Sequence, residues 1–387
     1  MKLKPSFIVF AALLVALMAS AADKIVVTGV TDGLSEPPVP VSISGFSGEA
    51  DEVIRFDLTV QGFTNVPPDA AQYLLSGSAN GNLTGRAQDK FNKSSLVNKS
   101  YTGASLRRQA HAFVDDFLAA IGRKGIGGTK IAFKKDNGQT GEIYISDFDG
   151  GGAQAITTDN AIVAAPEWVP HKLALFYTSY KRGNPDIYLH DLSTGERKAV
   201  APYPGSNMSP APSPDGRKVA MILSKSGSVD LYVADADGSD LKRLTTSKDD
   251  ESSPCWSPDG KWICFAGKVS ERRSLCKVSA SGGAIQRIST SGISNPSEPD
   301  WSPDRKWIVF TSQMGGFDIC VVPAAGGTAT VLVSGEDPSW GPNSRTVVYA
   351  RRSQNGRRVL SLLDVPTKQT KDISRISGSN SQPSWAK

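Results

Sequence analysis

Pro254-Cys255-Trp256-Ser257-Pro258-Asp259-Gly260 is the stretch that decides the fold, because it recurs along the chain at a nearly constant spacing. A second copy occupies 210–216, with proline in place of tryptophan, and a third occupies 299–305, with arginine in place of the last glycine. Degenerate copies start at Pro166, Pro338 and Pro383. Successive copies begin 44, 44, 45, 39 and 45 residues apart. A period of about 40 to 45 residues with several strands per unit is typical of a β-propeller.

Every copy is followed by the same succession of short strands and turns. The tryptophan strand ends in Pro-Asp-Gly, a turn in which proline presets φ and glycine accepts a positive φ. A second strand follows, as at 262–265, and a third strand follows a polar turn, as at 231–233. A tight acidic turn at 235–238 then leads into a fourth strand at 243–245. Four strands per unit make one propeller blade.

The two ends of the array complement each other. The first unit, 130–157, lacks its tryptophan strand, whereas the sequence ends in Pro-Ser-Trp-Ala-Lys at 383–387, which is that strand and little else. We therefore predict an all-β, six-bladed β-propeller at 129–387, closed by pairing of the C-terminal strand with 131–133. Closure leaves no unpaired sheet edge at the ends of the array. The variable loops between blades lie opposite the Pro-Asp-Gly turns, and such loops on a rigid ring are common binding surfaces.

Residues 22–122 do not repeat, and they predict a small N-terminal α/β domain. Its clearest element is a helix at 106–121, where apolar residues recur with a period of about 3.6. Strands are expected at 24–28 and 71–76. At 53–61 apolar and polar residues alternate, which favours a strand, although a helix ending at Gly62 fits the same residues. A glycine-rich linker at 123–128 joins this domain to the ring.

The net charge and the N-terminal residues limit which class of protein this chain can be. The 387 residues carry 43 Lys and Arg against 38 Asp and Glu, a formal net charge of +5. So small an excess excludes a strongly basic nucleic-acid binder by charge alone. Residues 1–21 read as a signal peptide, because Lys2 and Lys4 precede an apolar run at 7–18 and an Ala-Ser-Ala cleavage site at 19–21. The alternative is a buried N-terminal helix. We expect an exported chain without a transmembrane segment after cleavage.

Export affects how the cysteines are interpreted, because disulfides form in oxidising compartments. Cys264, Cys276 and Cys320 each lie in an apolar, strand-like run. This setting favours small buried hydrophobic residues over reactive thiols. The alternative is a disulfide between Cys264 and Cys276 across one hairpin.

Patterns for catalysis or metal binding are scarce. The histidines are His111, His171 and His190. They form no i, i+4 metal pair, and His111 fits helix packing. The acids of two tight turns are Asp147, Asp149, Asp235 and Asp237. We interpret them as turn formers. No G-x-S-x-G nucleophile motif occurs, and the sequence ends at the ring, so we expect no hydrolase domain. We predict no enzymatic activity, no cofactor and no bound metal.

The chain resembles the TolB family of the Tol-Pal envelope system. The resemblance rests on the sixfold Pro-x-Trp-Ser-Pro-Asp-Gly array, degenerate copies included. It also rests on Leu-Arg-Arg-Gln-Ala-His at 106–111, which runs into Lys-Gly-Ile-Gly-Gly-Thr-Lys-Ile-Ala-Phe at 124–133. The third stretch is Asp-Lys-Ile-Val-Val-Thr-Gly at 23–29, directly after the signal peptide. The linker passage is the most specific of the three.

The resemblance implies binding in the periplasm, with a role in outer-membrane integrity and in constriction during cell division. It implies that the ring binds the Pal lipoprotein and that the mature N-terminal segment binds the C-terminal domain of TolA. Other outer-membrane lipoproteins or porins are further partners of this kind. The segment expected to contact TolA comprises Asp23, Lys24, Ile25, Val26, Val27 and Thr28, which also fit an ordinary first strand. The positions expected to contact Pal are Ser206, Ser209 and Ser252. The alternative is a periplasmic propeller enzyme, either similar to polysaccharide lyases or associated with a peptidase.

Overall fold

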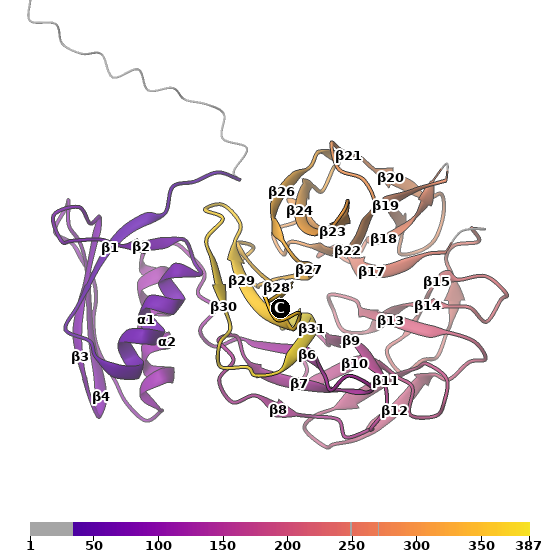
Figure 1. Cartoon of the computed structure of the whole chain (residues 1–387), viewed down its shortest axis with the longest axis horizontal. Coiled ribbons are helices and arrows are strands. Elements are labelled where there is room, and N and C mark those ends of the chain that lie inside the picture. Colours follow the sequence, from indigo (N-terminus) through magenta and orange to yellow (C-terminus); the bar gives the residue numbers. More distant parts are fainter. Residues whose placement is uncertain (1–33, 248–249, 270) are drawn as a thin grey trace, which may run out of the picture.

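A computed structural model describes residues 34–247, 250–269 and 271–387. The signal peptide expected at 1–21 and the strand expected at 24–28 lie outside these residues. The described residues form six four-stranded antiparallel sheets around an axis, with an α/β unit packed against one side of the ring (Figure 1). The predicted six-bladed β-propeller with a small α/β domain is confirmed. No helix in the described part of the chain is long and apolar enough to cross a membrane.

Each blade runs outward from the axis, and its innermost strand carries the tryptophan motif or its degenerate copy. The first blade contains β31 (Ser379–Trp385), β6 (Lys130–Asp136), β7 (Gly141–Asp147) and β8 (Gln154–Ala155). The second contains β9 (Val163–Trp168), β10 (Ala174–Ser179), β11 (Asp186–Asp191) and β12 (Arg197–Ala201). The third contains β13 (Asn207–Pro212), β14 (Lys218–Leu223), β15 (Asp230–Asp235) and β16 (Lys242–Arg243).

The remaining three blades repeat this order. The fourth contains β17 (Ser252–Trp256), β18 (Trp262–Val269), β19 (Arg272–Ser279) and β20 (Gln286–Ile288). The fifth contains β22 (Pro296–Trp301), β23 (Trp307–Gln313), β24 (Phe317–Pro323) and β26 (Thr330–Ser334). Beside it, β21 (Thr290–Ser291) pairs in parallel with β25 (Gly327–Thr328). The sixth contains β27 (Glu336–Trp340), β28 (Thr346–Arg352), β29 (Arg358–Asp364) and β30 (Thr370–Asp372).

The C-terminal strand closes the ring as predicted. β31 pairs antiparallel with β6, and Trp385 lies opposite Ile131. The Trp385 indole is buried, its ring stacks on Phe148 at 6.3 Å between centroids, and its Nε1 donates to Thr129 Oγ1 at 2.8 Å. The first blade is therefore assembled from residues about 250 positions apart in the sequence, without a free sheet edge between its two parts.

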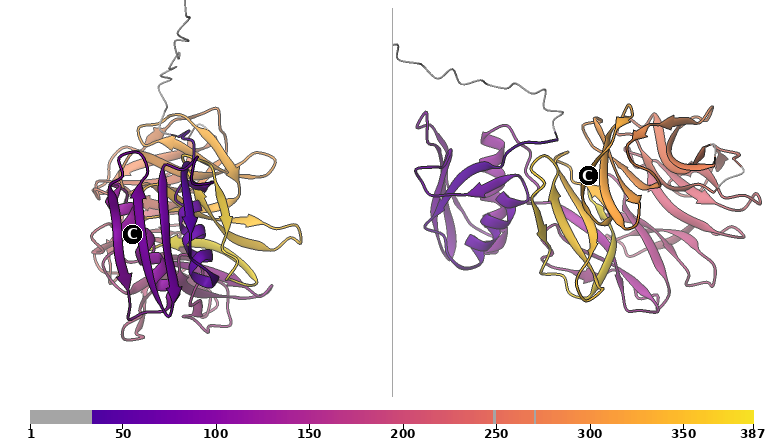
Figure 2. Two further views of the ribbon diagram at one scale, coloured as in Figure 1. Left: turned by 90° about the vertical axis from the view of Figure 1, so that its left-hand side faces the viewer. Right: turned by 45° about the horizontal axis from the view of Figure 1, so that its top comes forward.

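The α/β unit has a five-stranded sheet covered on one face by two helices. The strands, in spatial order, are β2 (Phe63–Asn65), β1 (Val39–Ser44), β3 (Tyr73–Asn80), β4 (Asn82–Asp89) and β5 (Ser95–Tyr101). The helices are α1 (Gly48–Thr59) and α2 (Leu106–Ala120). Both lie between the sheet and the ring, so that the uncovered face of the sheet points away from the propeller (Figure 2). Ser105 caps α2 by accepting a hydrogen bond from the backbone of Arg108, as expected for an N-cap serine.

The stretch at 53–61, for which strand and helix were both open, forms the second half of α1 and its C-terminal turn. Ile54 and Leu58, one helical turn apart, pack into the core beneath the sheet. Phe56 and Val60, also one turn apart, pack against the propeller. The helix is apolar on two sides because the sheet covers one side and the propeller covers the other. Its sequence therefore shows the same alternation of apolar and polar residues as a strand.

All four cysteines are free and buried. Cys264 lies opposite Lys277, whereas Cys276 lies opposite Phe265. Directly opposed residues share one face of a sheet and successive residues alternate, so the two cysteines point to opposite faces. The alternative of a Cys264–Cys276 disulfide is therefore wrong, and the interpretation as small buried hydrophobic residues is confirmed.

Candidate protein-binding site at the channel mouth

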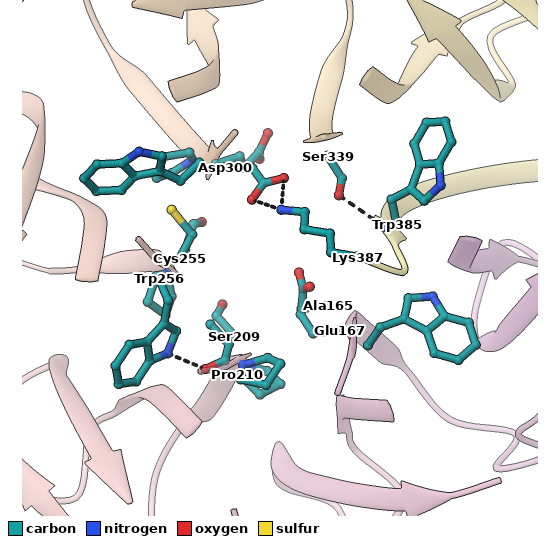
Figure 3. A pocket seen from close by; sticks show the side chains of 18 of the residues that line it. Ala165, Glu167, Ser209, Pro210, Cys255, Trp256, Asp300, Ser339, Trp385 and Lys387 are labelled. Atoms are coloured by element: carbon teal, nitrogen blue, oxygen red, sulfur yellow. Dashed lines mark hydrogen bonds and ion pairs between the residues drawn. The ribbon is translucent and has the colours of Figure 1, made fainter. Parts of the chain in front are cut away.

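A cavity of about 350 Å³ lies on the propeller axis, and the innermost strands of all six blades contribute to its wall (Figure 3). Its lining repeats the sequence motif, with prolines and tryptophans from successive copies placed around the axis. The motif that sets the blade period thus also builds the channel.

Six bulges surround one mouth of this channel. In each innermost strand the residue before the motif proline has a left-handed backbone, with φ between 47° and 56°. The six residues are Ala165, Ser209, Ser253, Glu298, Asp337 and Gln382, here called the mouth ring. At each of them the register with the neighbouring strand shifts, which defines a β-bulge. A left-handed non-glycine residue costs about 1 to 3 kcal/mol, and such strain concentrates at functional sites.

One side of the mouth ring is acidic. Glu298 Oε2 accepts hydrogen bonds from Thr311 Oγ1 at 2.6 Å and from the backbone N–H of Asp337 at 3.0 Å. Asp337 Oδ2 accepts from the backbone N–H of Gln382 at 2.9 Å. Burial, together with the negative charge of Glu298, raises the pKa of Asp337 to about 8. The opposite side of the ring is small and neutral, so the mouth is electrostatically asymmetric.

Deeper in the channel, charged groups from three blades meet. Lys387 Nζ lies 2.6 and 2.7 Å from the two carboxylate oxygens of Asp300, as Figure 3 shows. Glu167 accepts a hydrogen bond from Ser384 Oγ at 2.8 Å. Burial, with a smaller contribution from the charge of Asp300, raises the pKa of Glu167 to about 7. The channel wall therefore offers hydrogen-bonding and anionic groups around a narrow space.

The three serines expected to contact Pal lie in different positions relative to the mouth ring. Ser209 belongs to the mouth ring. Ser206 lies outside the described lining, in the loop before β13, where its backbone N–H donates to Ser224 Oγ at 2.7 Å. Ser252 begins β17, and its hydroxyl accepts from Arg273 Nη2 at 2.6 Å. The next residue, Ser253, lines the mouth instead. The segment at 23–28 that was expected to contact TolA lies outside the described residues.

Sequence reasoning missed most of the mouth ring, although a signal for it existed. Each member directly precedes the motif proline, so aligning the six copies on that proline would have found them all. Proline normally disfavours a helical conformation in the preceding residue but leaves other conformations open. The left-handed bulge itself has no signature in composition, because serine, glutamate, aspartate, glutamine and alanine all occupy it.

The described residues include no group of three or more His, Cys, Asp and Glu side chains arranged to hold a metal ion. Asp235 pairs with Lys218 at 2.7 Å, and Asp237 accepts from the backbone N–H of Ser239 at 3.0 Å, as expected for turn formers. Asp147 and Asp149 are different, because both contact the α/β unit. The turn-former interpretation is incomplete for these two residues.

Comparison with known proteins agrees with this architecture. Residues 118–387 match the family model described as TolB beta propeller domain. A Tol-Pal system protein TolB of Polaromonas sp. (strain JS666 / ATCC BAA-500) is 32% identical over 224 residues, which cover 49% of this chain and 51% of that protein. One of the same description from Jannaschia sp. (strain CCS1) is 28% identical over 224 residues, which cover 46% and 50%. The chain thus spans about half the length of the curated relatives it matches.

A solved structure extends the likeness of the fold beyond the propeller. The crystal structure of TolB from Acinetobacter baumannii superposes with a TM-score of 0.82, covering 91% of this chain and 98% of that one at 23% identity. At this identity the likeness concerns the fold, and the family model carries the assignment. With a match over residues 118–387, the chain belongs to the TolB β-propeller family.

Proposed function

We propose that this chain is a non-catalytic, protein-binding component of a Tol-Pal envelope system and that it works in the periplasm. Its ring binds the Pal lipoprotein at the mouth that carries the inter-blade loops. Its mature N-terminal segment, 23–28, binds the C-terminal domain of TolA. The consequence for the cell is maintenance of outer-membrane integrity and of constriction during division.

The mouth ring is the observation that carries this proposal. Six strained, non-glycine residues place their side chains around one opening of a closed and rigid ring. Variable loops on such a scaffold are a common location for binding surfaces. Acidic residues on one side of the mouth and small neutral residues on the other would favour one orientation of a bound partner. This role requires no catalytic group.

The N-terminal half of the proposal comes from the family resemblance and from the pattern of the segment itself. Ile25 and Val27 alternate with Lys24 and Val26 in a short stretch with high strand propensity. A strand of this kind binds by adding to the edge of a partner's sheet, where the main chain supplies affinity and alternate side chains supply specificity.

Direct titration tests both halves. Residues 22–387 are titrated with the soluble domain of a peptidoglycan-associated lipoprotein, beside the variants Ser206→Trp and Thr194→Trp. Ser206 lies on the inter-blade face, whereas Thr194 is exposed in the β11–β12 turn on the opposite face. We expect loss of affinity of at least tenfold for Ser206→Trp and none for Thr194→Trp. Equal effects of the two variants would contradict a site at this mouth.

A second arm concerns TolA. A chain that begins at residue 29 is expected to lose binding of the TolA C-terminal domain while it keeps the lipoprotein. Pull-down from envelope extract with residues 22–387 then identifies the partner. Recovery of only porins or other outer-membrane lipoproteins would contradict the proposal that the ring binds Pal. Turnover of oligosaccharides or peptides by the same preparation would contradict the non-catalytic assignment.

A further inference from the structure

The α/β unit meets the propeller through an apolar patch with buried charges beside it. Phe56 and Val60 of α1 pack against a cluster that includes Phe148, Ile373 and Trp385 of the ring. The rings of Phe56 and Phe148 lie 6.1 Å apart. This apolar contact does not itself depend on pH.

His111 of α2 connects both units inside this interface. Its Nδ1 lies 2.7 Å from Asp57 Oδ2 of α1. Its Nε2 lies 3.1 Å from Arg107 Nη1 of its own helix and 3.4 Å from Asp149 Oδ2 of the β7–β8 turn. Its ring also contacts Phe148 edge to face at 5.2 Å. Relative exposures are 3% for His111, 0% for Asp57 and 4% for Asp149, so water screens these charges little.

Other charged groups complete the network around the histidine. Arg107 of α2 donates through Nη1 to Asp149 Oδ1 at 2.6 Å and also pairs with Asp147. Lys130 Nζ lies 2.8 Å from Asp147 Oδ1, and Arg375 Nε of the β30–β31 loop lies 3.6 Å from Asp149 Oδ2. On α2 itself, Asp115 accepts from the backbone N–H of Gly127 at 3.1 Å.

The charge balance of this network depends on His111. In the described part of the chain the acids are Asp57, Asp115, Asp147, Asp149 and Glu49, which pairs with Arg375, and the other bases are Arg107, Lys130 and Arg375. Three positive charges against five negative charges leave −2 with a neutral imidazole and −1 with an imidazolium. Asp57 Oδ1, which is buried, has no hydrogen-bond partner among the described residues, so His111 is the group that compensates this carboxylate. An uncompensated buried charge is strongly destabilising.

We propose that the α/β unit docks on the propeller with uptake of a proton at His111, so that this single charge acts as a latch between the two units. The docked state requires the imidazolium to bridge Asp57 of one unit and Asp149 of the other. Loss of that proton leaves a further buried negative charge uncompensated, and the interface loosens.

The titration behaviour supports this geometry. Burial opposes a charged imidazole, but the charges of Asp57 and Asp149 and their hydrogen bonds raise the pKa of His111 to about 9. Burial also raises the pKa of Asp57 to about 6, against the lowering effect of His111. Asp57 stays beside His111 when the units separate, so the part of these shifts that docking adds comes from burial against the ring and from Asp149. His111 therefore binds its proton more tightly when docked, and docking weakens as the pH rises through about 9. The lowered pKa of Asp149 acts only in strong acid.

Histidine substitution in the whole chain tests the latch. The variant is His111→Asn, and the matched control is His171→Asn. His171 is an exposed histidine of the propeller with a left-handed backbone, a conformation that asparagine also adopts. The readout is the rate of tryptic cleavage between Arg123 and Lys124 in the linker, normalised to cleavage of a free peptide at each pH. Ile126 of the same linker is buried in the cluster that Phe56 and Val60 form with the ring, so cleavage beside it reports undocking.

For the unsubstituted chain and the control we expect cleavage to rise severalfold between pH 7 and pH 9.5, because docked His111 loses its proton near pH 9 and the separated α/β unit lacks the charge of Asp149. For His111→Asn we expect fast cleavage already at pH 7, with little further change. An unsubstituted chain whose cleavage does not depend on pH, or a variant that behaves like the control, would overturn the proposal. If the variant does not fold, the imidazole resonance of the unsubstituted chain decides: a His111 that titrates at 6.5 or below refutes the latch.

Discussion

Replacing Trp385 with alanine removes the side chain that seals the ring. The indole is 2% exposed, stacks on Phe148 and donates to Thr129 Oγ1 at 2.8 Å. Truncating a buried tryptophan to alanine costs about 3 to 5 kcal/mol, and the lost hydrogen bond adds about 1 kcal/mol. For a ring of this size, each kcal/mol corresponds to about 2 °C, so we expect a fall in Tm of about 8 to 12 °C.

Thermal unfolding followed by circular dichroism measures this effect, with Trp256→Ala as the matched control. Trp256 holds the same motif position in an internal blade, where it is only partly buried and donates to the backbone O of Ala211 at 2.8 Å. The control should lose about half as much. If Trp385→Ala melts within about 2 °C of the unsubstituted chain, or no lower than Trp256→Ala, the C-terminal strand does not hold the ring closed.

Three further predictions follow from buried groups. Burial raises the pKa of Cys276 and that of Cys320 to about 12, so iodoacetamide at pH 8 should label neither thiol in the native chain and both in denaturant; rapid native labelling counted by mass spectrometry would contradict their burial. Gly85→Ala would place a Cβ 2.4 Å from the ring of buried Phe113, so chemical denaturation should show a loss of about 1 to 3 kcal/mol, and an unchanged midpoint would refute the close packing. Burial raises the pKa of Glu167 to about 7, so the stability that its protonated carboxyl contributes is complete below the ordinary pKa of glutamate and is lost as the pH rises through about 7. Glu167→Gln should therefore gain stability relative to the unsubstituted chain as the pH rises over that range. A difference in Tm that is the same at pH 5 and at pH 8 would contradict this.

The propeller was predictable because its information is local and repeated. Each motif copy specifies a strand, a turn and the start of the next strand, so six copies fix the number of blades without knowledge of distant contacts. Even the pairing of β31 with β6 followed from two incomplete units whose missing parts complement each other.

The interface with the α/β unit was not predictable in the same way. Asp57, His111 and Asp149 are separated by about 54 and 38 positions, and no spacing rule connects them. Asp149 looks like an ordinary turn acid in the sequence, because the helix that uses it belongs to a different unit. The alternation at 53–61 misled for the same reason, since the second apolar side of α1 exists only where the ring covers it.

The sequence does not reveal which of two adjacent serines in β17 lines the channel, for a related physical reason. Ser252 and Ser253 are chemically identical, and only the bulge decides which of the two faces the channel. A bulge turns one extra residue inward and shifts the register of its neighbours, which neither composition nor alternation reveals. The constant position before the motif proline is the better guide to the mouth.

Hydrogen exchange in the presence of a partner tests most directly whether this mouth is the binding surface. The chain at 22–387 is labelled with and without the soluble domain of a peptidoglycan-associated lipoprotein, and peptic peptides are compared. We expect slower exchange in the inter-blade loops at 201–209, 289–298, 334–337 and 374–382. Protection confined to the Pro-Asp-Gly turns on the opposite face, or no protection at saturating partner, would contradict binding at the mouth.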